Sequence, residues 1–241
     1  MSAAADVEVH PDEPTLAAAI AGRLVRSLAQ AQAARGTASV VLTGGGIGTA
    51  ALAALATAPA LDDVDWRRVE FWWGDERFLP SGDPERNETG ARSALLDKVR
   101  VDPALVHPMP ASDGPDGDDP EAAAARYAAA LRTGFDVVLL GIGPEGHVAS
   151  LFPGMPALHD DRPVVAVRDS PKPPPTRITL TFGPIRSARE VWILASGASK
   201  TDAVARALSG ADPDDVPAAG AHGAERTMFL LDTTAAAGLP G

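Results

Sequence analysis

The chain has 241 residues, of which 45% are hydrophobic and 22% charged, a composition typical of a globular protein. Its formal net charge of −11 argues against a nucleic-acid partner, because the phosphate backbone requires a basic binding surface. The absence of cysteine excludes disulfides and thiolate metal sites and favours a reducing compartment. We recognise neither a signal peptide nor a membrane-spanning run, so we expect a cytoplasmic protein with no membrane partner.

The N-terminal part of the chain predicts a helix, a strand and a second helix. Apolar side chains recur every four residues from Leu16 to Leu28, which predicts an amphipathic helix over 15–35. The apolar run 39–42 predicts a short buried strand, and helical periodicity resumes over 49–58.

A glycine-rich segment, T-G-G-G-I-G, separates that strand from the second helix. Such a loop presents backbone N–H groups to an anion, so Gly44, Gly45 and Gly46 are candidate phosphate-binding residues. A tight turn without a ligand is an equally good interpretation of this segment alone.

The next strand, at 69–73, runs into the polar cluster Gly74-Asp75-Glu76-Arg77, with Asn87 following. Taken alone, this cluster is better explained as a solvated charged turn than as a site. The remaining predicted elements are helix 89–99, a surface loop at 111–120, helix 121–132, strands 137–140, 164–167 and 177–182, a proline-rich loop at 170–176, strand 191–194, a helix ending at 208 and strand 228–231.

Strands that alternate with helices along the whole length predict a single domain over residues 1–241. We expect a Rossmann-like α/β fold with a mostly parallel sheet and helices on both faces. Four predicted strands end in glycine-rich or charged loops, at 44–48, 74–77, 141–147 and 196–200. Parallel strands bring such loops to one edge of the sheet, which favours one shared site.

The segment that follows strand 137–140 carries the candidate catalytic residues. A glycine-rich turn leads to Glu145 and His147, and we expect His147 to open the next helix. Histidine is suited to general-base chemistry near neutral pH, and either Glu145 or Asp75 could orient its ring. A structural hydrogen-bonding role is the alternative for a lone histidine.

These residues can be compared with the requirements of several kinds of binding site and reaction. G-x-G-x-x-G at 141–146 and its variant at 46–51 also fit a dinucleotide-binding fingerprint. The five histidines show no ligand spacing for zinc, and the serine-hydrolase elbow G-x-S-x-G is missing. A histidine, nearby carboxylates, an anion-binding loop and the cations Arg77 and Lys200 suit attack of water on an activated carbonyl of a phosphorylated small molecule.

The segment G-I-G-P-E-G-H-V-A-S-L-F-P-G at 141–154 resembles the G-x-G-x-D-G-H-x-A-S-L-F-P-G pattern of 6-phosphogluconolactonases. The segments W-G-D-E-R at 73–77 with Asn87, R-I-T at 177–179 and G-A-S-K at 197–200 are similar to further elements of that family. The related glucosamine-6-phosphate deaminases share the G-x-G-x-D-G-H part but continue toward F-N-E-P.

The resemblance implies hydrolysis of 6-phospho-D-glucono-1,5-lactone in the pentose phosphate pathway, without a metal or cofactor. The sequence does not reveal the oligomeric state, and we favour a monomer. It assigns His147 as the base on water and Glu145 as its support. Its remaining site assignments are Gly44, Gly45, Gly46, Arg77 and Lys200 around the phosphate, and Asn87 and Arg177 in the sugar site. We add Asp75 as a further candidate for substrate binding.

Two departures from the family pattern bear on this assignment. Glu145 stands where the pattern has aspartate. Its side chain is one methylene longer, so its hydrogen-bond geometry with His147 is in question. The phosphate loop lacks the later hydroxyls of S-G-G-S-T-P, so backbone donors must contribute more. A deaminase, a nicotinamide-binding protein and a non-catalytic sugar-phosphate sensor remain as alternatives.

Overall fold

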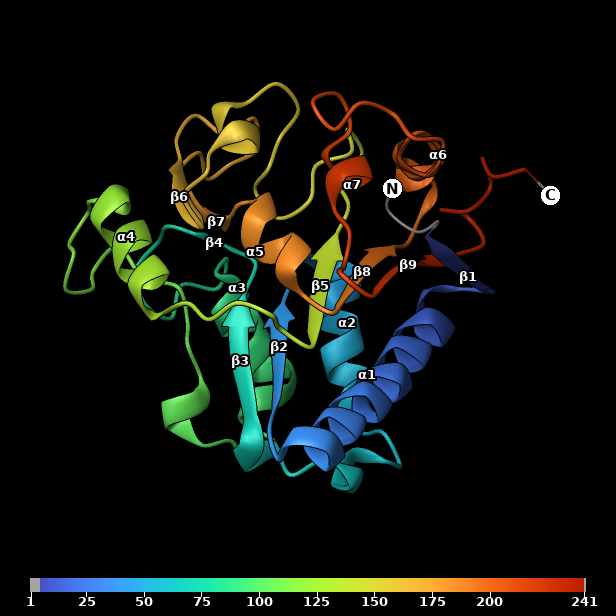
Figure 1. The fold of residues 1–241 in the computed structure, drawn as a ribbon, viewed down its shortest axis with the longest axis horizontal. Coiled ribbons are helices and arrows are strands. Elements are labelled where there is room, and N and C mark those ends of the chain that lie inside the picture. The colour runs from blue at the N-terminus through green and yellow to red at the C-terminus, as the bar shows by residue number, and fades with distance from the viewer. Residues whose placement is uncertain (1–4, 241) are drawn as a thin grey trace.

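A six-stranded sheet forms the centre of the computed structural model, which describes residues 5–240 (Figure 1). The strand order is β1-β9-β8-β5-β2-β3, and every neighbouring pair is parallel. The predicted Rossmann-like α/β fold with a mostly parallel sheet is therefore confirmed. The strands of this sheet are β1 Asp6–His10, β2 Ala38–Leu42, β3 Val69–Trp73, β5 Val137–Gly141, β8 Glu190–Ala195 and β9 Arg226–Asp232.

Helices flank the sheet. The long helix α1, Glu13–Arg35, agrees closely with the predicted range. Its first turn is capped by Asp12, whose carboxylate accepts from the Thr15 N–H, and it ends where Gly36 turns left-handed at φ 83°. The other helices are α2 Gly45–Leu55, α3 Asn87–Ala91, α4 Pro120–Ala130, α5 Phe182–Ser187, α6 Thr201–Leu208 and α7 Pro217–Gly220, with a π-helical turn at Arg92–Leu96 and 3₁₀ turns at Leu61–Asp63, Trp66–Arg68, Pro103–Leu105, Pro156–His159 and Ala198–Lys200.

A second, smaller sheet lies beyond the carboxyl ends of β2 and β3 (Figure 1). It contains β4 Asp75–Arg77, β7 Arg177–Leu180 and β6 Val164–Val167, paired antiparallel in that order. The charged cluster interpreted above as a solvated turn is thus a strand. Its carboxylates are buried: Asp75 is 7% exposed and Glu76 is fully enclosed.

Several boundaries differ from the sequence predictions. The strand predicted over 177–182 ends at Leu180, because Phe182 already opens helix α5. α2 begins at Gly45 rather than at residue 49, so most of the glycine run is the first turn of the helix. The helix predicted over 89–99 begins at Asn87 and passes into the π-helical turn. His147 does not open a helix, because two isolated bridges of Val148, with Ile142 and Leu151, hold this segment as a compact loop.

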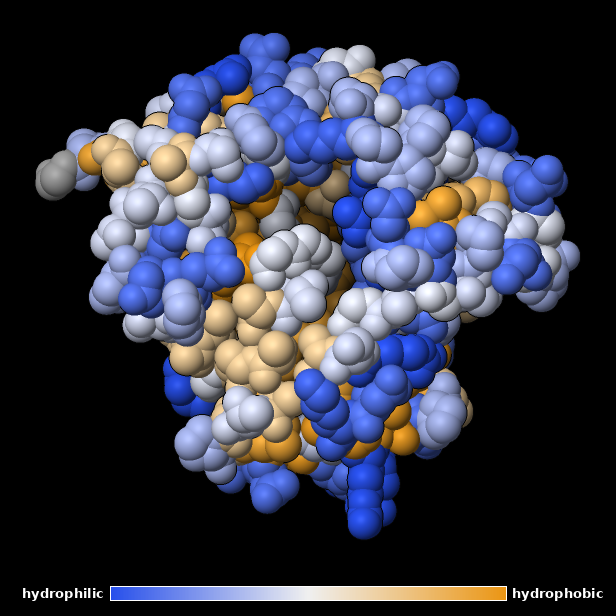
Figure 2. Space-filling view, turned by 180° about the vertical axis from the view of Figure 1, so that it is seen from behind, coloured by the Kyte–Doolittle hydropathy of each residue, from blue (hydrophilic) through white to orange (hydrophobic). Residues whose placement is uncertain are grey.

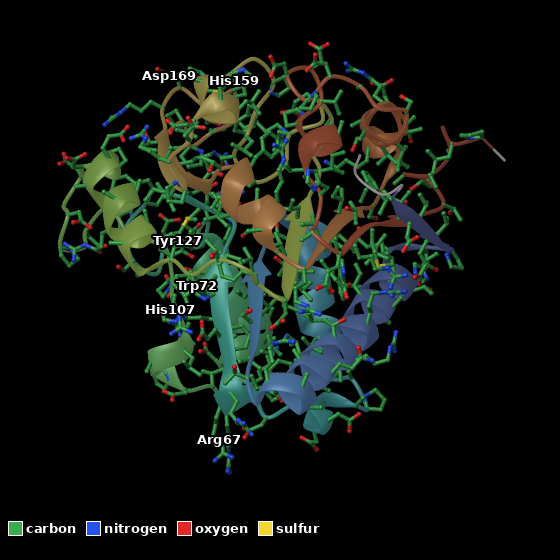
Figure 3. The ribbon with its side chains drawn as sticks, viewed as in Figure 1. Arg67, Trp72, His107, Tyr127, His159 and Asp169 are labelled. Atoms are coloured by element: carbon green, nitrogen blue, oxygen red, sulfur yellow. The ribbon has the colours of Figure 1, made fainter. Side chains whose placement is uncertain are left out.

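An aromatic cluster fixes β3 against α4 (Figure 3). The ring of Trp72 stacks on His107 at a centroid distance of 4.0 Å and meets Tyr127 edge-on at 5.6 Å. The Tyr127 hydroxyl accepts from the backbone N–H of Trp73 at 2.9 Å. This contact secures the end of β3, from which Gly74 leads directly into β4.

No helix within residues 5–240 combines the length and the apolar character needed to cross a membrane.

Candidate active site

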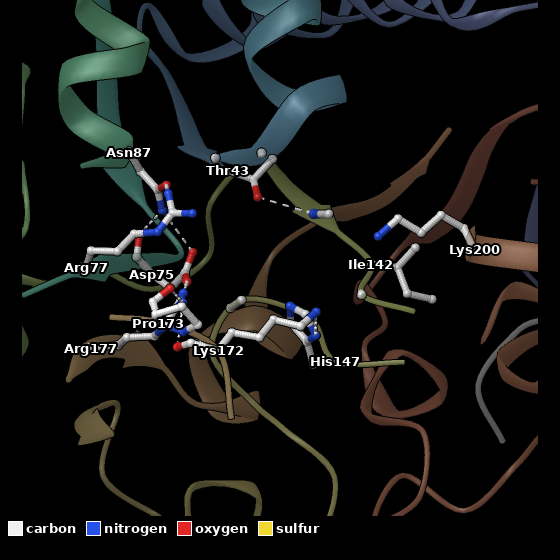
Figure 4. Close-up of a pocket in the computed structure, with 15 residues that line it drawn as sticks. Thr43, Asp75, Arg77, Asn87, Ile142, His147, Lys172, Pro173, Arg177 and Lys200 are labelled. Atoms are coloured by element: carbon white, nitrogen blue, oxygen red, sulfur yellow. Dashed lines mark hydrogen bonds and ion pairs between the residues drawn. The ribbon is translucent and has the colours of Figure 1, made fainter. Parts of the chain in front are cut away.

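A cavity of about 260 Å³ opens where the glycine-rich and charged loops converge. The rear face of the molecule is visibly hollowed (Figure 2), and the residues lining the cavity are drawn in Figure 4. The structure places most of the predicted site residues on this one cavity, namely Gly44, Gly45, Asp75, Arg77, Asn87, His147, Arg177 and Lys200. Gly46 and Glu145 do not line it, but Gly46 directly follows Gly45 and Glu145 contacts His147.

The amino end of α2 forms one wall of the cavity. Gly44 is the N-cap, and no side chain accepts from the first N–H groups of the helix. A helix start without a side-chain cap leaves backbone donors free for an anion. Two glycines are required here: Gly45 adopts φ 80°, and a Cβ at Gly44 would lie 1.9 Å from the Asn87 Oδ1 atom.

His147 lies on the cavity wall and forms a close pair with Glu145. The imidazole Nδ1 is 2.9 Å from Glu145 Oε1, so the longer side chain makes the contact that the sequence left in question. The loop is tight enough to require glycine at a further position, since a Cβ on Gly143 would lie 1.9 Å from the same Nδ1 atom. The Phe152 ring packs against the imidazole with centroids 4.5 Å apart.

The surroundings of this pair set its protonation. Burial lowers the pKa of His147 to about 4, with Lys172 acting in the same direction and Glu145 opposing it. Burial acts to raise the pKa of Glu145, but a backbone hydrogen bond and the cationic neighbours outweigh it and leave that pKa below its usual value. At neutral pH the site therefore holds a neutral imidazole beside an ionised carboxylate.

Asp75 is engaged elsewhere. Its Oδ2 accepts from the hydroxyl of fully buried Ser150 at 2.7 Å, and its Oδ1 accepts from the Asn87 side-chain amide at 3.2 Å. Of the two carboxylates considered from the sequence, Glu145 is the one in contact with His147. Ser150 belongs to the A-S-L-F-P-G stretch, so one residue of that motif holds a cavity carboxylate in place.

Glu76 organises the neighbouring helix start from within the core. Its carboxylate accepts from the backbone N–H groups of Asn87 at 2.6 Å and Glu88 at 2.9 Å, which caps α3. Burial raises the pKa of Glu76 to about 7, although Arg86 and these N–H groups favour its charged form. The cap fixes Asn87, whose side chain faces the cavity.

Two arginines on the cavity are held mainly by protein oxygens. Arg77 donates to Asn87 Oδ1 at 2.6 Å and to the Glu85 carbonyl at 3.0 Å. Arg177 donates to the carbonyls of Lys172, Pro173 and Pro174 at 3.1–3.2 Å. The guanidinium of Arg177 thus anchors the proline-rich loop as well as lining the cavity.

Lys172 is a charged cavity residue that the sequence did not assign. Its Nζ lies 3.0 Å from Glu145 Oε2. The available signal was a lysine between prolines in a stiff loop directly before Arg177, and this signal names no partner. Thr43, Gly141, Ile142, Gly143, Ala149 and Pro173 also line the cavity.

Within residues 5–240, no group of three or more His, Cys, Asp or Glu side chains is arranged to hold a metal ion.

An open parallel sheet, an uncapped helix start and clustered cations around a histidine–carboxylate pair define an α/β protein with a site for a small anionic ligand. Residues 11–229 match the family model described as glucosamine-6-phosphate isomerases/6-phosphogluconolactonase. The chain belongs to this family.

Curated relatives extend the match over the full length. A 6-phosphogluconolactonase of Streptomyces coelicolor is 56% identical over 252 residues, covering 100% of this chain and 97% of that protein. A 6-phosphogluconolactonase of Mycobacterium tuberculosis is 53% identical, covering 97% and 98%. Among solved structures, the 6-phosphogluconolactonase of Trypanosoma brucei superposes with a TM-score of 0.82 at 30% identity, covering 98% of this chain and 99% of that one.

Proposed function

We propose that this chain hydrolyses 6-phospho-D-glucono-1,5-lactone to 6-phospho-D-gluconate. This is the reaction for which its relatives are named. Full-length identity of 50% or more to proteins of that name supports the assignment. The observation that carries the chemistry is the 2.9 Å contact between His147 Nδ1 and Glu145 Oε1 on a cavity that is also lined at the uncapped start of α2.

In the proposed reaction, His147 acts as the general base. An ionised Glu145 accepts the Nδ1–H, which leaves the lone pair on Nε2 to take a proton from water. The water oxygen bonds to the lactone carbonyl carbon, and the bond from that carbon to the ring oxygen then breaks. The imidazolium returns the proton to the leaving ring oxygen, so one water is consumed and no cofactor is needed.

The phosphate of the substrate is proposed to bind at the amino end of α2. Backbone N–H groups of Gly44, Gly45 and Gly46 would donate to its oxygens. Arg77 and Lys200 approach the cavity from opposite sides (Figure 4), which would allow them to neutralise the anion together. Asp75, Asn87 and Arg177 would contact the sugar.

The direct test follows loss of freshly prepared 6-phosphogluconolactone above its spontaneous hydrolysis, with a chelator present. We expect rapid hydrolysis that the chelator leaves unchanged, and no ammonia release from glucosamine 6-phosphate under the same conditions. Deaminase activity without lactonase activity would overturn the proposal, as would binding of the lactone without turnover.

We further propose that the chain is a cytoplasmic monomer. Its partner is a phosphorylated sugar lactone, and it binds no nucleic acid. The lack of cysteine and the charge of −11 support the compartment and the absence of a polyanionic partner.

A further inference from the structure

One ammonium group beside the reacting histidine has no role in the reaction as described so far. Lys172 Nζ lies 3.0 Å from Glu145 Oε2. It also lies 3.5 Å from Nδ1 of His147, and both of these side chains are drawn in Figure 4. The two oxygens of Glu145 are therefore divided, with Oε1 on the imidazole and Oε2 on the ammonium.

The hydrogen positions follow from this division. The Glu145 carboxylate is ionised, so the short contact at Oε1 requires a proton on Nδ1 of His147. An ammonium and an Nδ1–H are both donors, hence the 3.5 Å approach of Lys172 to the ring is a contact between like charges when the ring is protonated. Lys172 binds the carboxylate and disfavours the imidazolium.

The backbone holds Lys172 firmly in this position. Ser170 Oγ accepts from the Lys172 N–H at 3.3 Å and donates to its carbonyl at 3.1 Å. Arg177 donates to the same carbonyl at 3.2 Å. Prolines follow on the C-terminal side and restrict the chain further. The side chain retains 39% exposure, so it is directed to the cavity without being sealed in the core.

We infer that Lys172 is a positioning residue for the lactonase reaction, fixing the Glu145 carboxylate against His147 and keeping the imidazole uncharged until water gives up its proton. This inference rests on the proposed function. Two carboxylates, those of Glu145 and Asp75, face His147 or share its cavity and favour the imidazolium. The cationic groups around the same cavity are Lys172, Arg77, Arg177 and Lys200.

The chemical benefit concerns both proton transfers. A carboxylate alone raises the pKa of a neighbouring histidine and would leave more of the base protonated in mildly acidic solution. The ammonium offsets that charge while it preserves the hydrogen bond that orients the ring. The imidazolium formed during the reaction is then a stronger acid toward the leaving ring oxygen.

The test compares Lys172→Met and Lys172→Gln, which remove the charge, with Lys172→Arg, which keeps it. Lys98→Met is the matched control, since Lys98 is exposed and outside the cavity lining but carries the same charge. Two readouts are measured for each variant: the pH dependence of kcat/KM on the phosphorylated lactone, and the NMR titration of the His147 Cε1–H in the free protein.

We expect both neutral variants to shift the His147 titration and the acid limb of kcat/KM upward by about one pH unit or more. We expect kcat at pH 7.5 to fall by on the order of tenfold, as weaker orientation of the general base implies. The arginine variant and the Lys98 control should retain the wild-type midpoints.

Unchanged or lowered midpoints in the neutral variants would overturn the inference, and so would an equal rise in the Lys98 control. The NMR titration needs no substrate. It therefore tests the effect of Lys172 on His147 even if the wild-type protein proves inactive on the lactone, and that inactivity would count against the proposed function alone.

Discussion

The Glu145 carboxylate contacts two partners. Its Oε1 reaches the His147 ring at 2.9 Å while Oε2 reaches the Lys172 ammonium at 3.0 Å. The departure from aspartate thus preserves the contact with the histidine. The local pair was visible in the sequence because its members are two positions apart, whereas Lys172 comes from a distant loop whose approach depends on tertiary structure.

Replacing Glu145 with glutamine removes a negative charge beside His147, whereas the neutral Lys172 variants remove a positive one. Glutamine keeps the shape and an acceptor oxygen but removes the charge that raises the pKa of His147. We expect the His147 midpoint, read by NMR titration, to move below that of the wild-type protein. We expect kcat to fall by roughly 10- to 100-fold, because ring orientation weakens. A midpoint that rises in this variant would contradict the assignment.

At the scale of elements, the sequence predicts where the loops lie but not the secondary structure that they adopt. Glycine has low helix propensity, so the run at 44–48 predicted a loop, yet α2 begins at Gly45 because tertiary packing overrides propensity. The charged segment Asp75–Arg77 showed no strand pattern, and its pairing partner β7 lies about a hundred residues later in the chain. Its buried carboxylates are satisfied by hydroxyl, amide and backbone donors that no local pattern reveals.

The role of Lys200, which ends the 3₁₀ turn before α6, can be separated from the chemistry with Lys200→Ala. If Lys200 binds the phosphate, the variant should raise KM for the phosphorylated lactone by about tenfold or more, as loss of a charge-assisted contact implies. KM for unphosphorylated gluconolactone should change little. Parallel increases for both substrates would place Lys200 away from the phosphate.

At the scale of the molecule, Gly74 links the two sheets by hydrogen bonds. The Gly74 N–H donates to Leu42 of the parallel sheet, and the Gly74 carbonyl accepts from Leu180 of the antiparallel sheet. Buried side chains of both sheets belong to one hydrophobic cluster. We therefore propose that the chain is a single domain, as the alternation of strands and helices predicts.

A single domain should unfold in one cooperative transition. We expect the denaturant midpoint from tryptophan fluorescence to coincide with the midpoint from hydrogen exchange of the β4, β6 and β7 amides. The fluorescence reports on the parallel sheet, because Trp72, Trp73 and Trp192 are buried there. Earlier loss of the antiparallel sheet would show that the chain contains two separately stable units.

The central claim is that His147 accepts the proton of the attacking water, and kcat of a His147→Gln variant on the phosphorylated lactone tests it most directly. We predict a fall in kcat of at least ~100-fold with little change in KM and an unchanged circular dichroism spectrum, as loss of a general base implies. A near-normal kcat in the folded variant would contradict the account.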